Sequence, residues 1–160
     1  MVFYQLVVAV LLLILTLSLQ CVGVAGLIEW LKRVVRRDTP NFRPIRSAAL
    51  VVESSVAIII LHGLVILLWA AFYRMQCFSS WELAFYFSAS SYATVGYGDV
   101  VLSSNWRLLG PLESVTGVLM CGVSVCLLFS LVSRLVESTM HSAKENKTSV
   151  RPGPIVAARR

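Results

Sequence analysis

The sequence predicts an all-α integral membrane protein, and three observations indicate this fold class. Hydrophobic residues make up 58% of the 160-residue chain and charged residues only 14%, whereas soluble domains are about half apolar and about a quarter charged. Three apolar runs are long enough to cross a bilayer, which takes about 20 residues. Basic residues gather on one side of these runs, as they do in multi-pass membrane proteins.

The three membrane-spanning helices are expected at residues 1–31, 48–73 and 108–138. Residues 32–47 are predicted to form a basic loop between the first two helices. Residues 139–160 are polar and basic, too short for a folded regulatory domain, and are expected to be disordered or associated with lipid.

A fourth apolar segment, at residues 79–93, lies between the second and third spans. Its apolar part gives only about 20 Å of helix, which is too short to span, so it is expected to enter the membrane and return. At its start, SSWE, Ser79 is the candidate N-cap and Glu82 its capping-box partner.

The basic residues predict how the chain is oriented. Residues 32–47 and the region from the end of the third span onward hold all but Arg74 and Arg107 of the 14 Lys and Arg residues. By the positive-inside rule, both regions are cytoplasmic. We therefore expect a multi-pass protein of the plasma or inner membrane, with its N-terminus outside and its C-terminus in the cytoplasm. The basic loop is expected to meet anionic lipid headgroups.

A cleaved signal peptide is the alternative for the first 30 residues. The opening MVFYQ has no basic residue, although a signal peptide begins with a positive region. Gln20 also stands where a lipoprotein signal needs a small residue before Cys21. Cleavage would place the arginine-rich loop outside, against the charge rule, so an uncleaved helix is predicted.

The sequence contains no motif that favours an enzyme. No two of the four cysteines form a C-x-x-C pair, so neither a disulfide framework nor a zinc site is expected. H-E-x-x-H and G-x-S-x-G do not occur, and Val101 stands where a dinucleotide loop needs a third glycine after Gly96 and Gly98. No nucleic-acid partner is expected.

The stretch SASSYATVGYGDV, residues 88–100, offers mainly its own backbone for chemistry. Irregular backbone at membrane depth survives only where it lines a water-filled path or is buried in protein. Gly96 and Gly98 can reach dihedral angles closed to other residues, so successive carbonyl groups can point the same way. Rings of such oxygens can replace the hydration shell of a cation.

SSYATVGYGDV resembles the potassium channel signature T-x-x-T-x-G-Y-G, and residues 48–138 resemble the two-helix pore module of that family. The resemblance implies an outer helix at 48–73, a pore helix at 79–93, a selectivity filter at 94–99 and an inner helix at 108–138. It implies a homotetramer that conducts K⁺ passively and selectively, because one chain supplies only a quarter of each oxygen ring. Residues 1–31 would be an extra transmembrane helix.

The resemblance also implies roles for individual residues. K⁺ ions would be bound by Thr94, Val95, Gly96 and Tyr97, with Gly98 completing the ion-binding segment. Filter support is assigned to Asp99, Tyr86, Ser90, Ser91 and Glu113. The wall of the cavity and the gate are assigned to Gly117, Val118, Cys121, Gly122, Val125 and Phe129, although helix packing is nearly as well supported for any one of them.

Several residues depart from the family pattern. Ser91 replaces the first threonine of the signature, and Ser90 stands where some relatives have an acid. We hypothesise that the Tyr86 hydroxyl bonds Asp99, and that Glu113 replaces the missing acid behind the filter.

Two residues inside the spans keep two interpretations each. His62 either packs with its hydrogen bonds satisfied, the more favoured interpretation, or senses protons. Gly117 is either a hinge or a packing contact.

Two other functions remain open from the sequence. A non-selective or non-conducting subunit could regulate another channel, and a membrane scaffold could merely oligomerise through its apolar helices. A voltage sensor is not predicted, because its arginines should recur every third residue within a span, whereas KRVVRR lies at the end of one.

Overall fold

The computed structural model describes residues 2–37 and 44–149, which form four α-helices and contain no strand. The helices are α1 (Val2–Arg37), α2 (Pro44–Gln76), α3 (Trp81–Tyr92) and α4 (Leu109–Ser149). The predicted fold class, an all-α membrane protein with one short helix between the second and third long ones, is confirmed.

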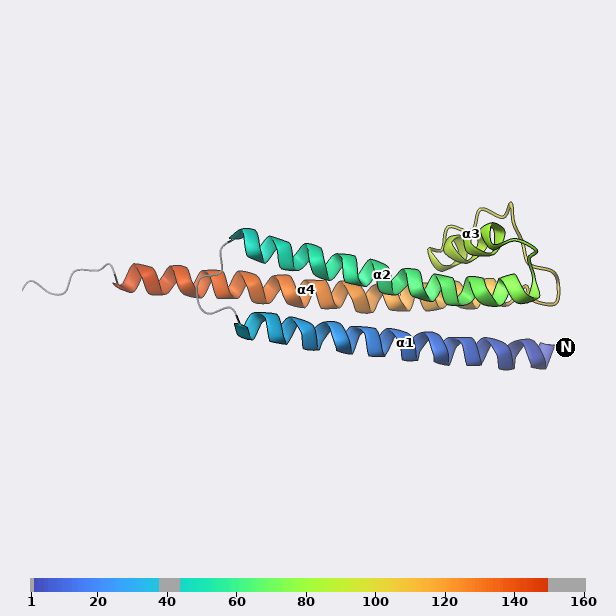
Figure 1. Ribbon diagram of the computed structural model, residues 1–160, viewed down its shortest axis with the longest axis horizontal. Helices are drawn as coiled ribbons and strands as arrows, with labels where there is room; N and C mark the ends of the chain where they lie inside the picture. Colours follow the sequence, from blue (N-terminus) through green and yellow to red (C-terminus); the bar gives the residue numbers. More distant parts are fainter. Residues whose placement is uncertain (1, 38–43, 150–160) are drawn as a thin grey trace, which may run out of the picture.

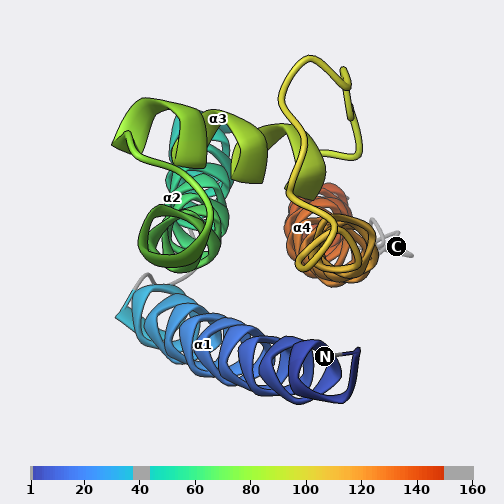
Figure 2. The same ribbon diagram turned by 90° about the vertical axis from the view of Figure 1, so that its right-hand side faces the viewer.

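The three long helices lie side by side, with α2 antiparallel to α1 and α4 (Figure 1). The short α3 and the loops around it lie at the end that holds the N-terminus. Seen along the bundle, α3 crosses over α2 and α4 on the side opposite α1 (Figure 2). The loop between α3 and α4 begins on this side and then returns toward α1, where the ring of Trp106 packs edge-on against that of Tyr4, with centroids 5.9 Å apart.

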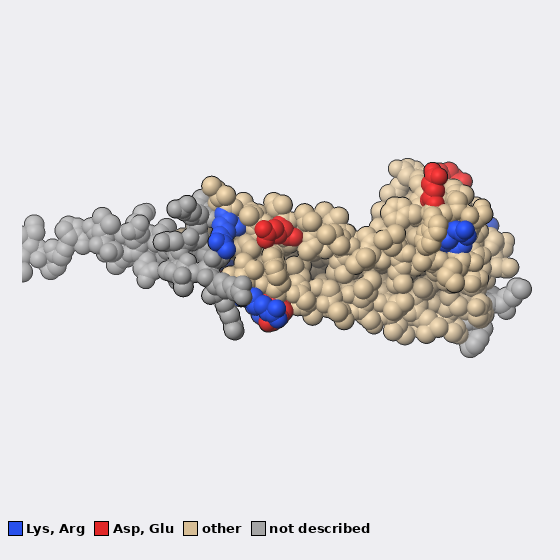
Figure 3. All heavy atoms as spheres, in the orientation of Figure 1, with Lys and Arg blue, Asp and Glu red and all other residues tan. Residues whose placement is uncertain are grey.

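Each long helix contains an apolar segment able to cross a membrane. These segments are Tyr4–Val34, Ile45–Gln76 and Leu109–Glu137, close to the three predicted spans. On the face drawn in Figure 3, the charged side chains lie toward the two ends of the bundle, with a wide uncharged band between them. The chain is therefore a membrane protein with three spanning helices.

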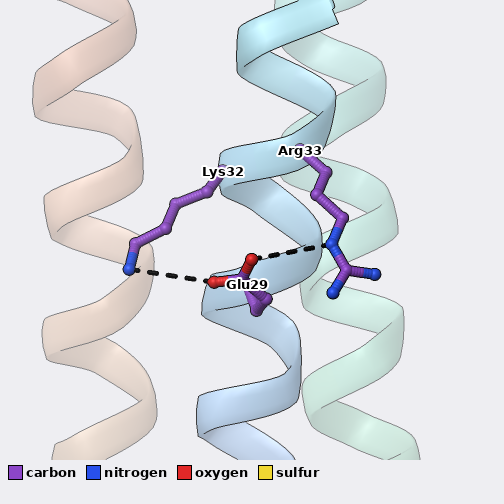
Figure 4. Close-up of polar contacts among 3 residues, drawn as sticks. All are labelled: Glu29, Lys32 and Arg33. Carbon is purple, nitrogen blue, oxygen red and sulfur yellow. Dashed lines mark ion pairs between the residues drawn. The ribbon is translucent and has the colours of Figure 1, made fainter.

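The first helix continues into the predicted basic loop, as far as Arg37. Glu29 forms ion pairs with Lys32 (3.9 Å) and Arg33 (3.6 Å), at i,i+3 and i,i+4 spacing (Figure 4). Such pairs stabilise helix, and basic side chains are favourable near a helix C-terminus. Residues 44–47 of the predicted loop belong to α2, which begins at Pro44, and residues 38–43, including Arg43, lie outside the described residues.

The last helix also continues beyond its predicted end at residue 138, as far as Ser149. The physical reason is composition, because this stretch contains Ala, Lys and Glu and meets no proline before Pro152. Residues 150–160 of the predicted tail lie outside the described residues.

The core of the bundle lies where α3 meets α2 and α4. It includes the fully buried Trp69 and Tyr73 of α2, Ala84 of α3 and Leu109 of α4. α1 packs against the other side of α2, where the Trp69 indole N–H donates a hydrogen bond to Thr16 Oγ1 (3.0 Å). Tightly packed α2 and α4 thus hold α3 in place.

Candidate functional site

The short helix α3 begins with a side-chain cap. Ser80 adopts an extended conformation, and its hydroxyl oxygen accepts a hydrogen bond from the Leu83 N–H (3.2 Å). The sequence predicted Ser79 as the cap and Glu82 as its capping-box partner, and this prediction was wrong by one residue. Because the cap lies at Ser80, Glu82 is the second helical residue, where its charge is favourable near the positive end of the helix dipole.

Glu113 of α4 joins the middle of α3 to α2. It is fully buried, and its carboxyl group lies within hydrogen-bonding distance of the Ser88 hydroxyl and accepts a hydrogen bond from the Tyr73 hydroxyl (2.9 Å). The Ser88 hydroxyl also lies 2.9 Å from the Ile66 carbonyl oxygen. A buried carboxyl group is costly unless it is hydrogen-bonded, and here two elements supply its partners.

The role of Glu113 in supporting the filter stays a prediction. Its partners belong to α3 and α2, and neither lies within residues 94–99. The reason is the path of α4, which passes Phe87 at Gly110 and Tyr92 at Gly117. Residue 113 therefore lies beside the body of α3 rather than beside the segment that follows it.

The C-terminal end of α3 is also held by both neighbouring helices. The Ser114 hydroxyl donates a hydrogen bond to the Ser91 carbonyl oxygen (2.6 Å). His62 of α2 contacts the Tyr92 hydroxyl through one ring nitrogen and the Ser124 hydroxyl through the other. His62 is thus a packing histidine with both nitrogens hydrogen-bonded, in agreement with the more favoured interpretation of the sequence.

The segment after α3 has an alternating backbone. Thr94, Gly96 and Gly98 have positive φ angles of 60°, 54° and 79°, whereas Val95 and Tyr97 between them do not. Thr94 is the one non-glycine residue of the described chain in this left-handed region, which costs strain for a residue with a side chain. When residues of positive and negative φ alternate in this way, successive peptide groups point in similar directions. The N–H groups then lie on one side of the segment and the carbonyl groups on the other.

The amide groups of this segment face α3. The Thr94 N–H donates to the Ser91 carbonyl oxygen (3.0 Å), and those of Val95 and Gly96 both donate to the Ser90 carbonyl oxygen (2.9 and 3.3 Å). Within the described residues, the carbonyl oxygens of residues 94–98 accept no hydrogen bond, and residues 93–99 are exposed. The segment therefore presents a row of carbonyl oxygens that have no partner within its own chain.

The predicted hydrogen bond between Tyr86 and Asp99 is present. The Tyr86 hydroxyl donates to Asp99 Oδ2 (2.7 Å), and the Val100 N–H donates to Oδ1 (3.0 Å). The hydrogen bond from Tyr86 holds the pKa of the Asp99 carboxyl below its ordinary value and raises the pKa of Tyr86. The rings of Tyr86 and Tyr97 stack nearly parallel, with centroids 6.5 Å apart. Tyr86 thus braces the segment at two points.

The residues that the sequence assigned to the cavity and the gate divide into two groups. Five of them are exposed on α4, where no element of the same chain covers them. They are Val118, Cys121, Gly122, Val125 and Phe129. Gly117 instead lies against α3, and a Cβ atom there would come 2.0 Å from the Tyr92 carbonyl oxygen. The contact supports the packing interpretation of Gly117.

Sequence reasoning missed the polar partners that hold α3, namely Ser88, Tyr73, Tyr92 and Ser124. A hydroxyl group within a short apolar helix was a usable signal for Ser88, because such a group must find a partner in the membrane. Its contact with Glu113 joins residues 25 positions apart, and no local pattern specifies that pairing.

Comparison with known proteins identifies a family over this part of the chain. Residues 58–134, which include all of α3 and the segment that follows it, match a family model described as "Ion channel". Neither the curated proteins nor the solved structures contain a match to the chain.

Gly117→Ala is expected to destabilise the protein, because the new methyl group clashes with the Tyr92 carbonyl group, which is main chain and cannot move aside as a side chain could. Overpacking of this kind costs about 1–3 kcal/mol and should lower the melting temperature of the detergent-solubilised protein. Gly122→Ala is the matched control, since a Cβ atom there meets nothing within 4 Å of its own chain. Equal melting temperatures for the two variants would contradict the packing role.

Tyr86→Phe is expected to raise the pKa of Asp99 toward its ordinary value of 3.8. A carboxyl group whose pKa is lowered by folding contributes stability above its unfolded pKa, and this contribution is lost as pH falls through the folded pKa. The order of the segment should therefore be lost at a higher pH in the variant. The measurement is an NMR titration of the Asp99 carboxyl carbon between about pH 2 and 6, with Tyr4→Phe as control. An unchanged midpoint in Tyr86→Phe would refute the contact.

Proposed function

We propose that this protein is an ion channel that conducts K⁺ passively and selectively as a homotetramer, and the match of residues 58–134 to an ion channel family model supports the proposal. The observation that carries the proposal is the alternating backbone of residues 94–98, whose carbonyl oxygens have no partner in the described chain. K⁺ loses its water only where oxygens at similar distances replace it. Carbonyl oxygens of Thr94, Val95, Gly96 and Tyr97 fit this requirement, and the Thr94 hydroxyl would complete the innermost site.

Four chains are needed because one chain presents its carbonyl row on one side only. Exposed apolar side chains are no argument for assembly in a membrane, where lipid can cover them. Exposed irregular backbone is an argument, because backbone at membrane depth must line water or contact protein. Fourfold symmetry meets both needs, since it places residues 94–98 of each chain around a common aqueous axis.

The charge distribution supports cation conduction. α3 runs toward residues 94–98, so its partially negative C-terminal end lies at their inner side. Asp99 lies at their outer side, and its carboxyl group is ionised at neutral pH, since its pKa lies below the ordinary value of 3.8. A cation is thus favoured at both ends of the row of oxygens, and an anion at neither.

The same arrangement supports an orientation in the membrane. Lys32 and Arg33 lie near the end of α1 and Arg46 lies in the first turn of α2, and these parts of the two helices are at the end of the bundle opposite α3 (Figure 1). With the positive-inside rule, this end faces the cytoplasm, whereas the N-terminus and Asp99 face outward. The protein would reside in the plasma or inner membrane, and its basic end would meet anionic lipid.

The decisive experiment is the reversal potential of purified protein in a planar bilayer under a K⁺/Na⁺ gradient. A value near the K⁺ equilibrium potential is expected. Gly96→Ala should abolish the current or shift the reversal potential toward zero, because a side chain at positive φ costs about 1–2 kcal/mol and distorts the segment. Gly63→Ala is the control, because a Cβ atom added at this helical glycine meets no other part of its own chain within 4 Å. A potential near zero would indicate a non-selective pore, and absence of current a regulatory subunit.

Cys121 tests whether the exposed face of α4 lines the ion path. A positively charged methanethiosulfonate reagent, applied from the cytoplasmic side, is expected to block the current by adding a bulky cation to each chain. Cys121→Ser should prevent the block. Cys126→Ser should not, because Cys126 is also exposed but five residues further along the helix, on another face. Block that persists in Cys121→Ser would refute this assignment.

A further inference from the structure

We propose that His62 is a positioning residue that couples the inner helix α4 to the base of the filter. The unit consists of His62, Tyr92 and Ser124 and is called the His62 bridge below. Its functional meaning rests on the proposed function, because it concerns how residues 94–98 are held open for ions.

The His62 bridge joins three helices through one imidazole ring. His62 Nδ1 lies 2.7 Å from the Tyr92 hydroxyl, and Nε2 lies 3.0 Å from the Ser124 hydroxyl. Tyr92 and Ser124 are both buried. Each hydroxyl group can donate or accept, so both contacts are satisfied in either tautomer of the neutral ring.

Tyr92 is well placed to transmit a movement of α4. It is the last residue of α3, two positions before Thr94. Its main chain meets α4 at Gly117, and its side chain reaches the ring that holds Ser124. Gly117 and Ser124 are separated by about two helical turns, or about 10 Å. A rotation or slide of α4 past Tyr92 must therefore break the bridge or move the residue that leads into the filter.

Hydroxyl residues of the long helices bond their own helix, a neighbouring helix or both, and Ser124 bonds a neighbouring one, as do Thr16 and Ser114. Ser18, Ser54, Ser55, Thr116 and Ser130 each bond the carbonyl oxygen four residues earlier in their own helix. Ser124 directs its hydroxyl to another helix instead. If the bridge opens, this hydroxyl can turn to the Met120 carbonyl oxygen, as its counterparts do. Opening thus leaves no unpaired hydroxyl on α4, and its cost falls on His62 Nε2, which loses its contact with Ser124.

A contact that the Ser124 hydroxyl can leave without becoming unpaired can act as a switch rather than as a fixed brace. With the bridge closed, α4, α2 and the end of α3 move together, and the position of Thr94 follows the inner helix. With the bridge open, α4 can bend or turn while the filter keeps its position. The bridge therefore decides whether movement of the inner helix reaches the ion-binding oxygens.

The test removes single hydroxyl groups in the full-length protein. Ser124→Ala and Tyr92→Phe should each speed amide hydrogen exchange in the peptide spanning residues 93–100 by about 3- to 10-fold, the effect of losing one hydrogen bond. The double variant should match the single ones, because each removes the same link. Ser124→Thr, which keeps a hydroxyl, should restore the wild-type rate. Ser130→Ala is the control, since its hydroxyl bonds only its own helix.

Single-channel recording supplies the functional readout. Ser124→Ala and Tyr92→Phe should shorten mean open time by a similar factor and leave the reversal potential unchanged, because the filter oxygens themselves are intact. Wild-type exchange and wild-type open times in both variants would overturn the proposal, as would an equal effect of Ser130→Ala. If the wild-type protein passes no K⁺, the proposed function fails, whereas hydrogen exchange still reports on the bridge.

Discussion

The structure depends on how α3, a helix too short to span a membrane, is held between its neighbours. Polar groups of a helix that packs within a membrane protein need partners inside the protein. The neighbouring helices supply these partners. Ser88 meets Ile66 and Glu113, and the Ser91 carbonyl oxygen meets Ser114. Hydrophobic contact alone would leave α3 free to slide in a membrane, so these directional bonds fix its position.

The fixed position of α3 also gives the N–H and carbonyl groups of the following residues different surroundings. The N–H groups of Thr94, Val95 and Gly96 are used by the last carbonyl groups of the helix. The carbonyl oxygens of the same residues are left facing away, and the alternating φ angles keep them aligned. The features that end the helix thus also leave a row of exposed carbonyl oxygens that have no partner within the described residues. Tyr86 performs the corresponding task at the outer end, through Asp99 and the stacked Tyr97 ring.

The first helix is linked to this arrangement through a continuous set of contacts. Thr16 accepts a hydrogen bond from Trp69, whose ring lies beside that of Tyr73, with centroids 6.0 Å apart. Tyr73 in turn bonds Glu113, which meets Ser88 of α3. α1 lies outside the residues that match the ion channel family, yet it packs on the helix that anchors the buried carboxyl group. α1 therefore stabilises the bundle by packing against α2.

The sequence by itself determined the membrane class, the three spans, the short fourth helix and the TVGYGD stretch, because hydropathy, length and glycine placement are local properties. It also supported the Tyr86–Asp99 bond, which joins residues close to one motif. The cap at Ser80, the partners of Glu113 and the packing of Gly117 against Tyr92 were decided only by the tertiary structure. These contacts depend on where α4 crosses α3, and a crossing point is set by how whole helix surfaces fit together. No residue of the sequence carries that information alone.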